Sequence, residues 1–358
     1  MPNLAALPAL VDPHVHLRGL AWAHKGDFTT ETSAAVAGGY WLVCDMPNTT
    51  PATLDPVALQ TKLDAVSAEA VCDWGVYFGA SAADNTYTYD RVADDVCGLK
   101  MFCNETTGNL LIADPQMREK HFAAWTYGKP LVVHAEGETV AEILSLVRKY
   151  RRQTHFLHIS TAFEIGLLSD AKNEGLPITV GVCPHHLWMT EDDERSLGAF
   201  GRMKPGLKSA ADRDALWGAI ESRVVDIVES DHAPHTREEK SSAAPPYGVP
   251  GLETTLPLLL TAVAEGRLSL NRVIELVSYA PCALWGLTPP KGTGCMVDLD
   301  AKYVFDASET QTKCKWSPFD GMTLTGRVRQ TFIRGVEVYD GEQVRAQPGF
   351  GKNVWARR

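Results

Sequence analysis

Two histidines near the start of the chain have the residue type and spacing of a pair of metal ligands. His14 and His16 follow a short apolar run that ends in Asp12-Pro13. Side chains two positions apart on a β-strand point to the same side of a sheet, and neutral imidazole is a common nitrogen ligand of transition metals. The pair alone also fits two hydrogen-bonded histidines that bind no metal, so the prediction depends on donors elsewhere in the chain.

Further potential donors stand at the ends of later apolar runs. Each has an ordinary alternative: a strand-end histidine can be a hydrogen-bonded core residue, a lysine can extend its amine to water, and an aspartate can cap a turn. Their recurrence at several strand ends is harder to explain in that way. Because imidazoles with a carboxylate suit zinc, the set predicts a metal site made by six residues: His14, His16, Lys100, His134, His158 and Asp231.

Eight short apolar or alternating runs must form the elements that carry these residues. They predict strands over 10–17, 40–46, 72–79, 96–102, 130–135, 154–159, 177–183 and 224–230. Helical spacing of apolar residues predicts helices between the strands over 29–37, 56–66, 139–149, 162–173 and 213–222, and after them over 252–264 and 271–279.

The alternation of strands and helices implies right-handed crossovers and a parallel sheet. Eight such units predict an α/β fold, a closed (β/α)8 barrel over residues 10–290, with chemistry at the carboxyl ends of its strands. Short β-rich pieces over 325–328, 331–333 and 336–339 predict a small β appendage, to which we assign residues 1–9 and 291–358 with the terminal segments. An open doubly wound sheet is the alternative. It is disfavoured in its dinucleotide-binding form because no glycine-rich loop follows the first strand.

Composition excludes several classes of protein. The chain has 358 residues, of which 45% are hydrophobic and 22% charged, as in ordinary globular proteins. It has no apolar run of the ~20 residues that span a bilayer and no secretory signal. A formal net charge of −10 argues against a nucleic-acid surface. Eight cysteines without a CxxC pair predict reduced thiols, so we expect a cytoplasmic protein with no membrane or nucleic-acid partner.

Four motifs make the resemblance to a known family specific. They are Asp12-Pro13-His14-Val15-His16-Leu17-Arg18, Met46-Pro47-Asn48-Thr49, Gly98-Leu99-Lys100 with Asn104-Glu105-Thr106, and Ser230-Asp231-His232-Ala233-Pro234-His235. With these motifs the chain resembles the dihydroorotases of the amidohydrolase superfamily over residues 10–287. The stretch 250–269 is most similar to the dihydroorotase domain of CAD, the multifunctional protein that begins pyrimidine synthesis.

The resemblance implies a role for each of these residues. His14, His16 and Asp231 would hold one zinc ion and His134 and His158 a second, with Lys100 bridging the two ions as a carbamate. The ions would activate a water for attack on an amide carbonyl, and Asp231 would move the proton as general base or acid. The substrate, dihydroorotate or carbamoyl aspartate, would be bound by Arg18, Asn48, Thr106, Lys204 and His235.

Several positions depart from the family pattern. The run Gly19-Leu20-Ala21-Trp22 replaces an acidic residue, Pro and Gly, and Thr107 replaces an aromatic residue of the mobile loop of animal CAD. Lys204 stands where animal CAD has an arginine, so the charge is kept and the bidentate geometry is lost. Asp45 and Glu229 replace small or apolar residues. Each of these two carboxylates either competes for metal and repels an anionic substrate, or pairs locally away from the site.

These departures leave three hypotheses. We favour a dihydroorotase-like domain with impaired or lost catalysis, similar to the inactive version in fungal CAD-like proteins, kept as a structural and dimerising module beside neighbouring domains of a larger polypeptide. The alternative is an active zinc dihydroorotase that interconverts N-carbamoyl-L-aspartate and dihydroorotate. A hydantoinase-type cyclic amidase is disfavoured, because Arg18 and Asn48 would recognise a carboxylate that a neutral ring lacks.

Overall fold

The computed structural model of the chain describes residues 2–106, 108 and 110–356. They divide into two compact units, each made of separate stretches of sequence. The first unit comprises Met1–Asp45, Asp64–Gly75 and Glu229–Val354, and the second comprises Met46–Leu63, Val76–Val228 and Trp355–Arg358. The first unit contains His14, His16 and Asp231, and the second contains Lys100, His134 and His158.

Eight parallel strands follow one another in chain order, as the sequence predicts for a (β/α)8 barrel. They are β2 (Leu10–Val15), β3 (Tyr40–Asp45), β4 (Asp73–Gly79), β5 (Gly98–Phe102), β6 (Leu131–His134), β7 (Thr154–Phe156), β8 (Ile178–Val182) and β9 (Ile227–Val228). Nearly every strand residue is buried. Burial on both faces explains why parallel strands have continuous apolar sequences instead of alternating ones.

Helices connect the strands. The five predicted between strands are α1 (Phe28–Ala37), α2 (Pro56–Glu69), α5 (Glu138–Tyr150), α6 (Ala162–Asn173) and α9 (Ala210–Glu221). Five others are too short or too weakly periodic for the sequence pattern to predict: α3 (Tyr89–Val92), α4 (Pro115–Ala124), α7 (Pro184–Trp188), α8 (Glu191–Leu197) and α10 (Arg237–Lys240). Within the described residues, no helix has both the length and the apolar character that a membrane crossing requires.

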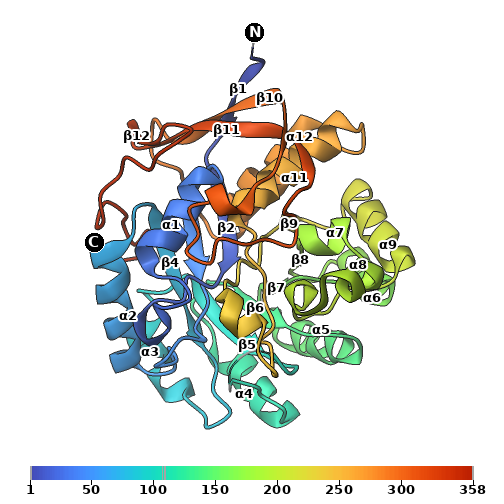
Figure 1. The fold of residues 1–358 in the computed structure, drawn as a ribbon. Coiled ribbons are helices and arrows are strands. Elements are labelled where there is room, and N and C mark those ends of the chain that lie inside the picture. Colours follow the sequence, from blue (N-terminus) through green and yellow to red (C-terminus); the bar gives the residue numbers. More distant parts are fainter. Residues whose placement is uncertain (1, 107, 109, 357–358) are drawn as a thin grey trace. The chain divides into compact units, whose positions relative to one another are not determined.

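A separate antiparallel sheet in the first unit forms the predicted β appendage (Figure 1). Its strands are β1 (Leu4–Pro8), β10 (Gly294–Val304), β11 (Thr323–Ile333) and β12 (Val336–Tyr339), in the order β1-β10-β11-β12. The predicted pieces 325–328 and 331–333 are one continuous strand, β11. The fold class is therefore α/β, a (β/α)8 fold with a β appendage.

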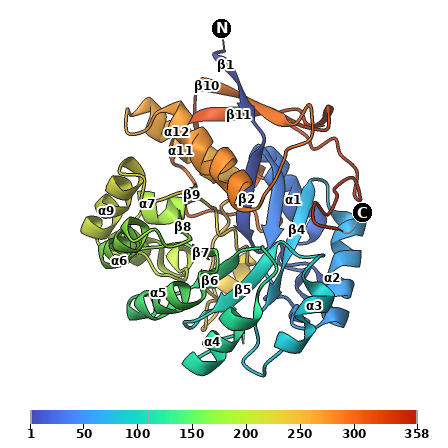
Figure 2. The same cartoon turned by 180° about the vertical axis from the view of Figure 1, so that it is seen from behind.

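Helix α11 (Leu252–Ala264) packs against β11 within the first unit (Figure 2). At Gly326 of β11, φ is 94°, and a Cβ there would lie 2.6 Å from the Cβ of Leu260 on the helix. Glycine thus allows the close approach of helix and sheet. The predicted helix over 271–279 begins as α12 (Leu270–Ile274) and continues through a π-helical turn, Glu275–Tyr279, into α13 (Ala280–Leu284).

A buried histidine in the second unit makes stability depend on pH. The His121 ring on α4 accepts a hydrogen bond from Tyr89 Oη at Nδ1 (2.5 Å) and donates one from Nε2 to the carbonyl oxygen of Ser81 (2.9 Å). Burial lowers the pKa of His121 below its usual value. Below about pH 6.5 the unfolded chain therefore binds more protons at this residue than the folded chain. The free energy of unfolding falls as the pH drops below that value, by up to about 1.4 kcal/mol per pH unit.

We expect the substitution His121→Gln to flatten this acid limb of the stability profile. The measurement is the free energy of unfolding in urea at a series of pH values between about 4 and 7. His24→Gln is the matched control, because the His24 side chain is 55% exposed. Acid limbs of equal slope in the parent and in His121→Gln would show that His121 does not cause the effect.

Candidate metal centre

One group of donors in the first unit converges on a single carboxylate. Asp231 Oδ1 lies 3.2 Å from His14 Nε2 and 3.1 Å from His16 Nε2. Two ligands held ~2.1 Å from one zinc ion at angles of about 90–110° lie about 3.0–3.4 Å apart, so the three donor atoms fit one metal ion. The end of β2 is held beside the segment after β9 by a hydrogen bond from the His16 amide to the His232 carbonyl (2.7 Å).

Two buried carboxylates support the histidine pair. Asp12 accepts hydrogen bonds from the backbone amides of His14 (3.1 Å) and Ser230 (3.2 Å), and burial nevertheless raises the pKa of Asp12 to about 7. Glu229 Oε1 lies 3.7 Å from His14 Nδ1, longer than a direct hydrogen bond. A carboxylate on this side of the ring favours the tautomer with its proton on Nδ1, which presents Nε2 to a metal.

A third buried carboxylate, Glu31 on α1, fixes the segment that carries Asp231. Glu31 accepts hydrogen bonds from His232 Nε2 (2.7 Å) and from Thr312 Oγ1 (2.6 Å). His232 in turn accepts a hydrogen bond at Nδ1 from the backbone amide of Gly251 (3.1 Å). Because His232 directly follows Asp231, this network sets the direction of the backbone at the converging carboxylate.

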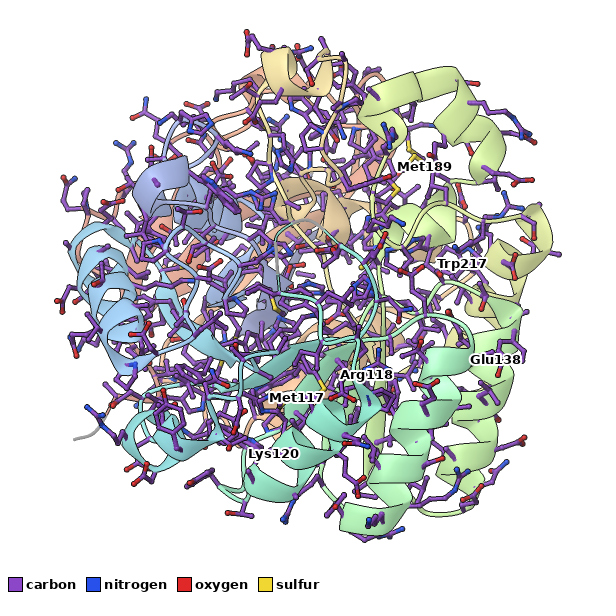
Figure 3. All side chains as sticks on the ribbon, turned by 90° about the horizontal axis from the view of Figure 1, so that it is seen from below. Met117, Arg118, Lys120, Glu138, Met189 and Trp217 are labelled. Atoms are coloured by element: carbon purple, nitrogen blue, oxygen red, sulfur yellow. The ribbon has the colours of Figure 1, made fainter. Side chains whose placement is uncertain are left out.

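We expect Glu31→Gln to lower the free energy of unfolding by about 1–3 kcal/mol, because it replaces a buried charged acceptor by a neutral amide that cannot accept every one of these bonds. Urea unfolding measures the change. Glu138→Gln, at an exposed position at the start of α5 (Figure 3), is the control. A difference between the two variants of less than about 0.5 kcal/mol would mean that the Glu31 network contributes little.

A second group of donors lies in the second unit. His134 ends β6, and its Nδ1 lies 2.9 Å from Nε2 of His158, which follows β7. This separation is close to the ~3 Å expected for two imidazole nitrogens at right angles around one ion. His134 Nε2 lies 3.0 Å from Glu136 Oε1. A carboxylate on the far nitrogen is the partner that commonly orients a metal-bound histidine.

Lys100 projects from β5 of the same unit and is completely buried. The parallel register pairs Lys100 with Val132 and Phe102 with His134, so Lys100 and His134 lie on one face of the sheet, two positions apart. Lys100 Nζ lies 4.6 Å from the centroid of the Phe102 ring. A lysine carbamate forms from the neutral amine and carbon dioxide, and burial in general disfavours the ammonium form of a lysine.

Lys204 lies near the carboxylate beside His134. Burial opposes the charged form of Glu136, but the hydrogen bond from His134 and the nearby cations Lys208 and Lys204 lower the pKa of Glu136 below its usual value. The positive charge of Lys204 thus stabilises the carboxylate of Glu136, which is the hydrogen-bond partner of His134 in the second donor group.

Arg18 lies in a buried cluster of cations in the first unit. Arg18 Nε donates a hydrogen bond to the Pro234 carbonyl (2.9 Å), and Nη2 lies 3.0 Å from His235 Nε2. Lys25 Nζ lies 3.3 Å from His235 Nδ1. Burial and the charges of Arg18, Lys25 and Lys240 hold the pKa of His235 far below its usual value, so its ring is neutral. Burial lowers the pKa of Arg18 to about 10, which leaves it cationic at neutral pH. Such a cluster suits an anionic ligand.

The remaining predicted substrate residues belong to the second unit. Asn48 is 5% exposed, and a Cβ at Gly108 would lie 3.6 Å from its Cβ, so the segment after β5 passes beside Asn48. Thr106 is half-buried in this segment, whereas Thr107 lies outside the described residues. Arg118 on α4 (Figure 3) holds both ends of the segment by donating to two backbone carbonyls, each at 2.7 Å.

Three of the candidate residues have a left-handed backbone. The angle φ is 63° at Arg18, 38° at His158 and 45° at Asp231. For residues with a side chain this region costs about 1–2 kcal/mol. Such residues concentrate at functional sites, where the surrounding structure holds them in place. The strain therefore supports a functional role for these three positions.

The structure gives a physical reason for three of the departures from the family pattern. Asp45 accepts a hydrogen bond from the Leu17 amide (2.7 Å) and so pairs locally. Glu229 faces His14 from the side opposite to the metal-binding nitrogen. At Gly19, φ is 58° and a Cβ would lie 2.4 Å from the Phe28 ring, so this turn requires glycine. None of the three substitutions by itself argues against catalysis.

Three supporting residues have no sequence signature. Glu31, Lys25 and Lys240 stand among other charged residues, and the first two contact rings 201 and 210 positions away. One signal was available: His232 and His235 belong to the same motif as Asp231, and buried imidazoles need hydrogen-bond partners. The motif therefore predicts that His232 and His235 have hydrogen-bond partners, but it does not identify those partners.

Known proteins match nearly the whole chain. The sequence profile of the Amidohydrolase family matches residues 5–338. The multifunctional protein CAD of Squalus acanthias is 40% identical over 355 residues, which are 99% of this chain and 16% of that protein. A dihydroorotase of Halobacterium salinarum is 32% identical over 375 residues, covering 96% of this chain and 88% of that protein. The chain thus spans 16% of the length of the CAD relative and most of the Halobacterium protein.

Solved structures share the fold. An L-hydantoinase of Arthrobacter aurescens has a TM-score of 0.91 at 26% identity, covering 97% of this chain and 88% of that one. The inactive dihydroorotase-like domain of a CAD-like multifunctional protein from Chaetomium thermophilum has a TM-score of 0.83 at 25% identity, covering 98% and 99%. Two proteins with different descriptions therefore have this architecture, so the activity must be argued from the site.

Proposed function

Because the chain belongs to the amidohydrolase family and is a dihydroorotase-like domain, we propose that it catalyses the interconversion of N-carbamoyl-L-aspartate and dihydroorotate. One observation carries the proposal: in the first unit, His14, His16 and Asp231 direct one donor atom each to a common position. The buried cations around Arg18 in the same unit support a substrate that carries a carboxylate.

We propose that the cofactor is a pair of zinc ions. The donors fit, because imidazole and carboxylate are ligands that zinc takes in proteins, and the separations of 3.1, 3.2 and 2.9 Å suit shared ions. His14, His16 and Asp231 would hold one ion, His134 and His158 the other, and Lys100 would bridge them as a carbamate. When bound, the ions activate water and polarise the amide carbonyl.

The side chains of the protein then have defined tasks. In hydrolysis of dihydroorotate, water adds to the ring carbonyl carbon, and Asp231 accepts a proton of that water and returns it to the ring nitrogen as the carbon–nitrogen bond breaks. In ring closure, Asp231 takes the proton from the ureido nitrogen and gives it to the departing hydroxide. Arg18 and the neutral ring of His235 bind the substrate carboxylate and so orient the ring, with Asn48, Thr106 and Lys204 as further substrate contacts.

A non-catalytic structural role is the second candidate. The likeness to the inactive Chaetomium domain supports it, as does Lys204, where a point charge replaces the planar fork of an arginine. In that case the domain would keep its metal donors and its fold without turnover. A hydantoinase-type activity is less favoured, because a neutral ring has no carboxylate for Arg18 and Asn48 to recognise.

Assays of the purified protein with dihydroorotate and with carbamoyl aspartate decide between these functions. We expect turnover in both directions with kcat of about 1–10³ s⁻¹ in the presence of zinc, and loss of activity after chelation. No turnover at full metal occupancy would favour the structural role. Turnover of hydantoin or dihydrouracil in preference to dihydroorotate would favour the cyclic amidase.

The setting of the domain is part of the proposal. The relation to CAD supports a place beside neighbouring domains of a larger polypeptide, and we propose that the domain forms a homodimer there. We propose a barrel over residues 10–290, with 1–9 and 291–358 in the appendage and terminal segments. None of the eight cysteines forms a disulfide within the described part of the chain, which suits a cytoplasmic location.

A further inference from the structure

A different group of metal-ligating side chains lies in the second unit, around the junction of β8 and α7 (Figure 1). Cys183 follows β8, and His185 and His186 belong to α7. One donor atom from each of the three residues lies within 4.8 Å of those from the other two, and all three side chains are buried. The sequence predicts only that the cysteines, Cys183 among them, are reduced thiols, and the proposed reaction uses none of the three residues.

The hydrogen bonding of His186 leaves one ring nitrogen available as a ligand. His186 Nε2 lies 3.0 Å from the carbonyl oxygen of Pro205. A carbonyl oxygen only accepts, so the proton is on Nε2 and Nδ1 has a lone pair. His186 is 2% exposed, and its Nδ1 makes no hydrogen bond to any described residue. A buried acceptor in this state is destabilising unless another partner satisfies it.

The rest of the segment holds the other two donors near this nitrogen. The imidazole centroids of His185 and His186 are 4.4 Å apart, and the rings are inclined by 63° instead of stacked. Pro184 fixes φ between Cys183 and the histidines. Trp217 on α9 (Figure 3) donates from Nε1 to the carbonyl of Leu187 at 2.7 Å and so pins α7. A short segment held at both ends keeps its side chains in one arrangement, as a metal site requires.

We propose that Cys183, His185 and His186 bind a zinc ion in addition to the pair proposed for catalysis. Thiolate and imidazole are ligands of protein zinc sites, with Zn–S of about 2.3 Å and Zn–N of about 2.0–2.1 Å. When the sulfur–zinc bond forms, the Cys183 thiol releases its proton to solvent. The carbonyl of Pro205 already orients His186 in the way that outer partners orient metal-bound histidines. The ion ties the end of β8 to α7 and leaves one tetrahedral position for water.

Zinc-edge X-ray absorption of the zinc-loaded chain tests this site directly. The residues proposed for the catalytic pair offer only nitrogen and oxygen, so a sulfur shell at about 2.3 Å reports a cysteine ligand. We expect that shell in the parent protein. We expect Cys183→Ala to lose it together with one zinc per chain, and Cys97→Ala, which removes another completely buried thiol of the second unit, to keep both.

Two results would overturn the site: a parent spectrum without sulfur, or a sulfur shell that persists in Cys183→Ala. If Cys183→Ala does not fold, the parent spectrum and the variant His186→Gln still decide, since loss of an imidazole ligand removes the ion as well. The measurement is separate from turnover. A protein without dihydroorotase activity can retain the sulfur shell, and an active enzyme can lack it, so failure of either proposal is recognised independently.

Discussion

Asp231→Asn will lower kcat for dihydroorotate hydrolysis by about 10²- to 10⁴-fold, the range lost with a general base. The amide keeps the shape of the side chain and tolerates the left-handed backbone at this position, where φ is 45°. It cannot take the proton of the attacking water. It also replaces the carboxylate oxygen that His14 and His16 approach to 3.2 and 3.1 Å, so zinc will be held less tightly. Steady-state kinetics at saturating zinc, with metal content measured on the same sample, test the prediction.

Asp214→Asn is the matched control for this experiment. Asp214 is exposed on α9 and pairs only with the neighbouring Arg213 among the ion pairs of the described chain, so its amide should leave kcat unchanged. If Asp231→Asn retains its metal and loses less than about tenfold in kcat, proton transfer must be assigned to another group.

Arg18→Lys will raise KM for dihydroorotate by about 10- to 100-fold, because losing one charge-assisted hydrogen bond costs about 1.5–3 kcal/mol. Arginine can donate to the Pro234 carbonyl from Nε and to a carboxylate from the other N–H groups of the same planar fork. Lysine keeps the positive charge but presents it at a single atom. The increase should appear chiefly in KM for both dihydroorotate and carbamoyl aspartate.

A substrate without the carboxylate separates recognition from general damage. Dihydrouracil is the ring of dihydroorotate with hydrogen in place of the carboxylate, so any residual turnover of dihydrouracil should be equal in the parent and in Arg18→Lys. Arg237→Lys, at an exposed position on α10, should behave as the parent does with both substrates. A parallel loss on dihydrouracil would mean that Arg18 supports the fold of the site instead of binding the carboxylate.

The order of strands was predictable from sequence, and the backbone at their ends was not. Buried parallel strands have continuous apolar sequences, so all eight predicted runs contain a strand. His158, predicted inside a strand over 154–159, lies beyond β7 in a left-handed conformation. Apolar pattern carries no information about such a turn, because contacts distant in sequence hold it. The polar helix α4 is not predictable from apolar pattern for a related reason: its start is specified by the cap Asp114 and by Pro115, not by periodicity.

The donor residues of the candidate site could be named from sequence because their types are uncommon at strand ends. Their supporting groups could not, since Glu31 reaches His232 across 201 positions and Lys25 reaches His235 across 210. Glu229 illustrates the difference. From the sequence, Glu229 could either compete for the metal or form a local ion pair. In the structure Glu229 faces His14 Nδ1, and this orientation identifies it as a carboxylate that supports the histidine.

The left-handed backbone at Arg18, His158 and Asp231 lowers thermal stability at positions that the proposed reaction requires. Glycine adopts these angles at almost no steric cost, so a laboratory screen that rewards survival on heating, with no demand for turnover, should accumulate glycine at His158 and Asp231. Each such variant would be more stable to heat and catalytically inactive. In a related gene that is no longer selected for catalysis, the same preference predicts that these positions are the first to change to glycine.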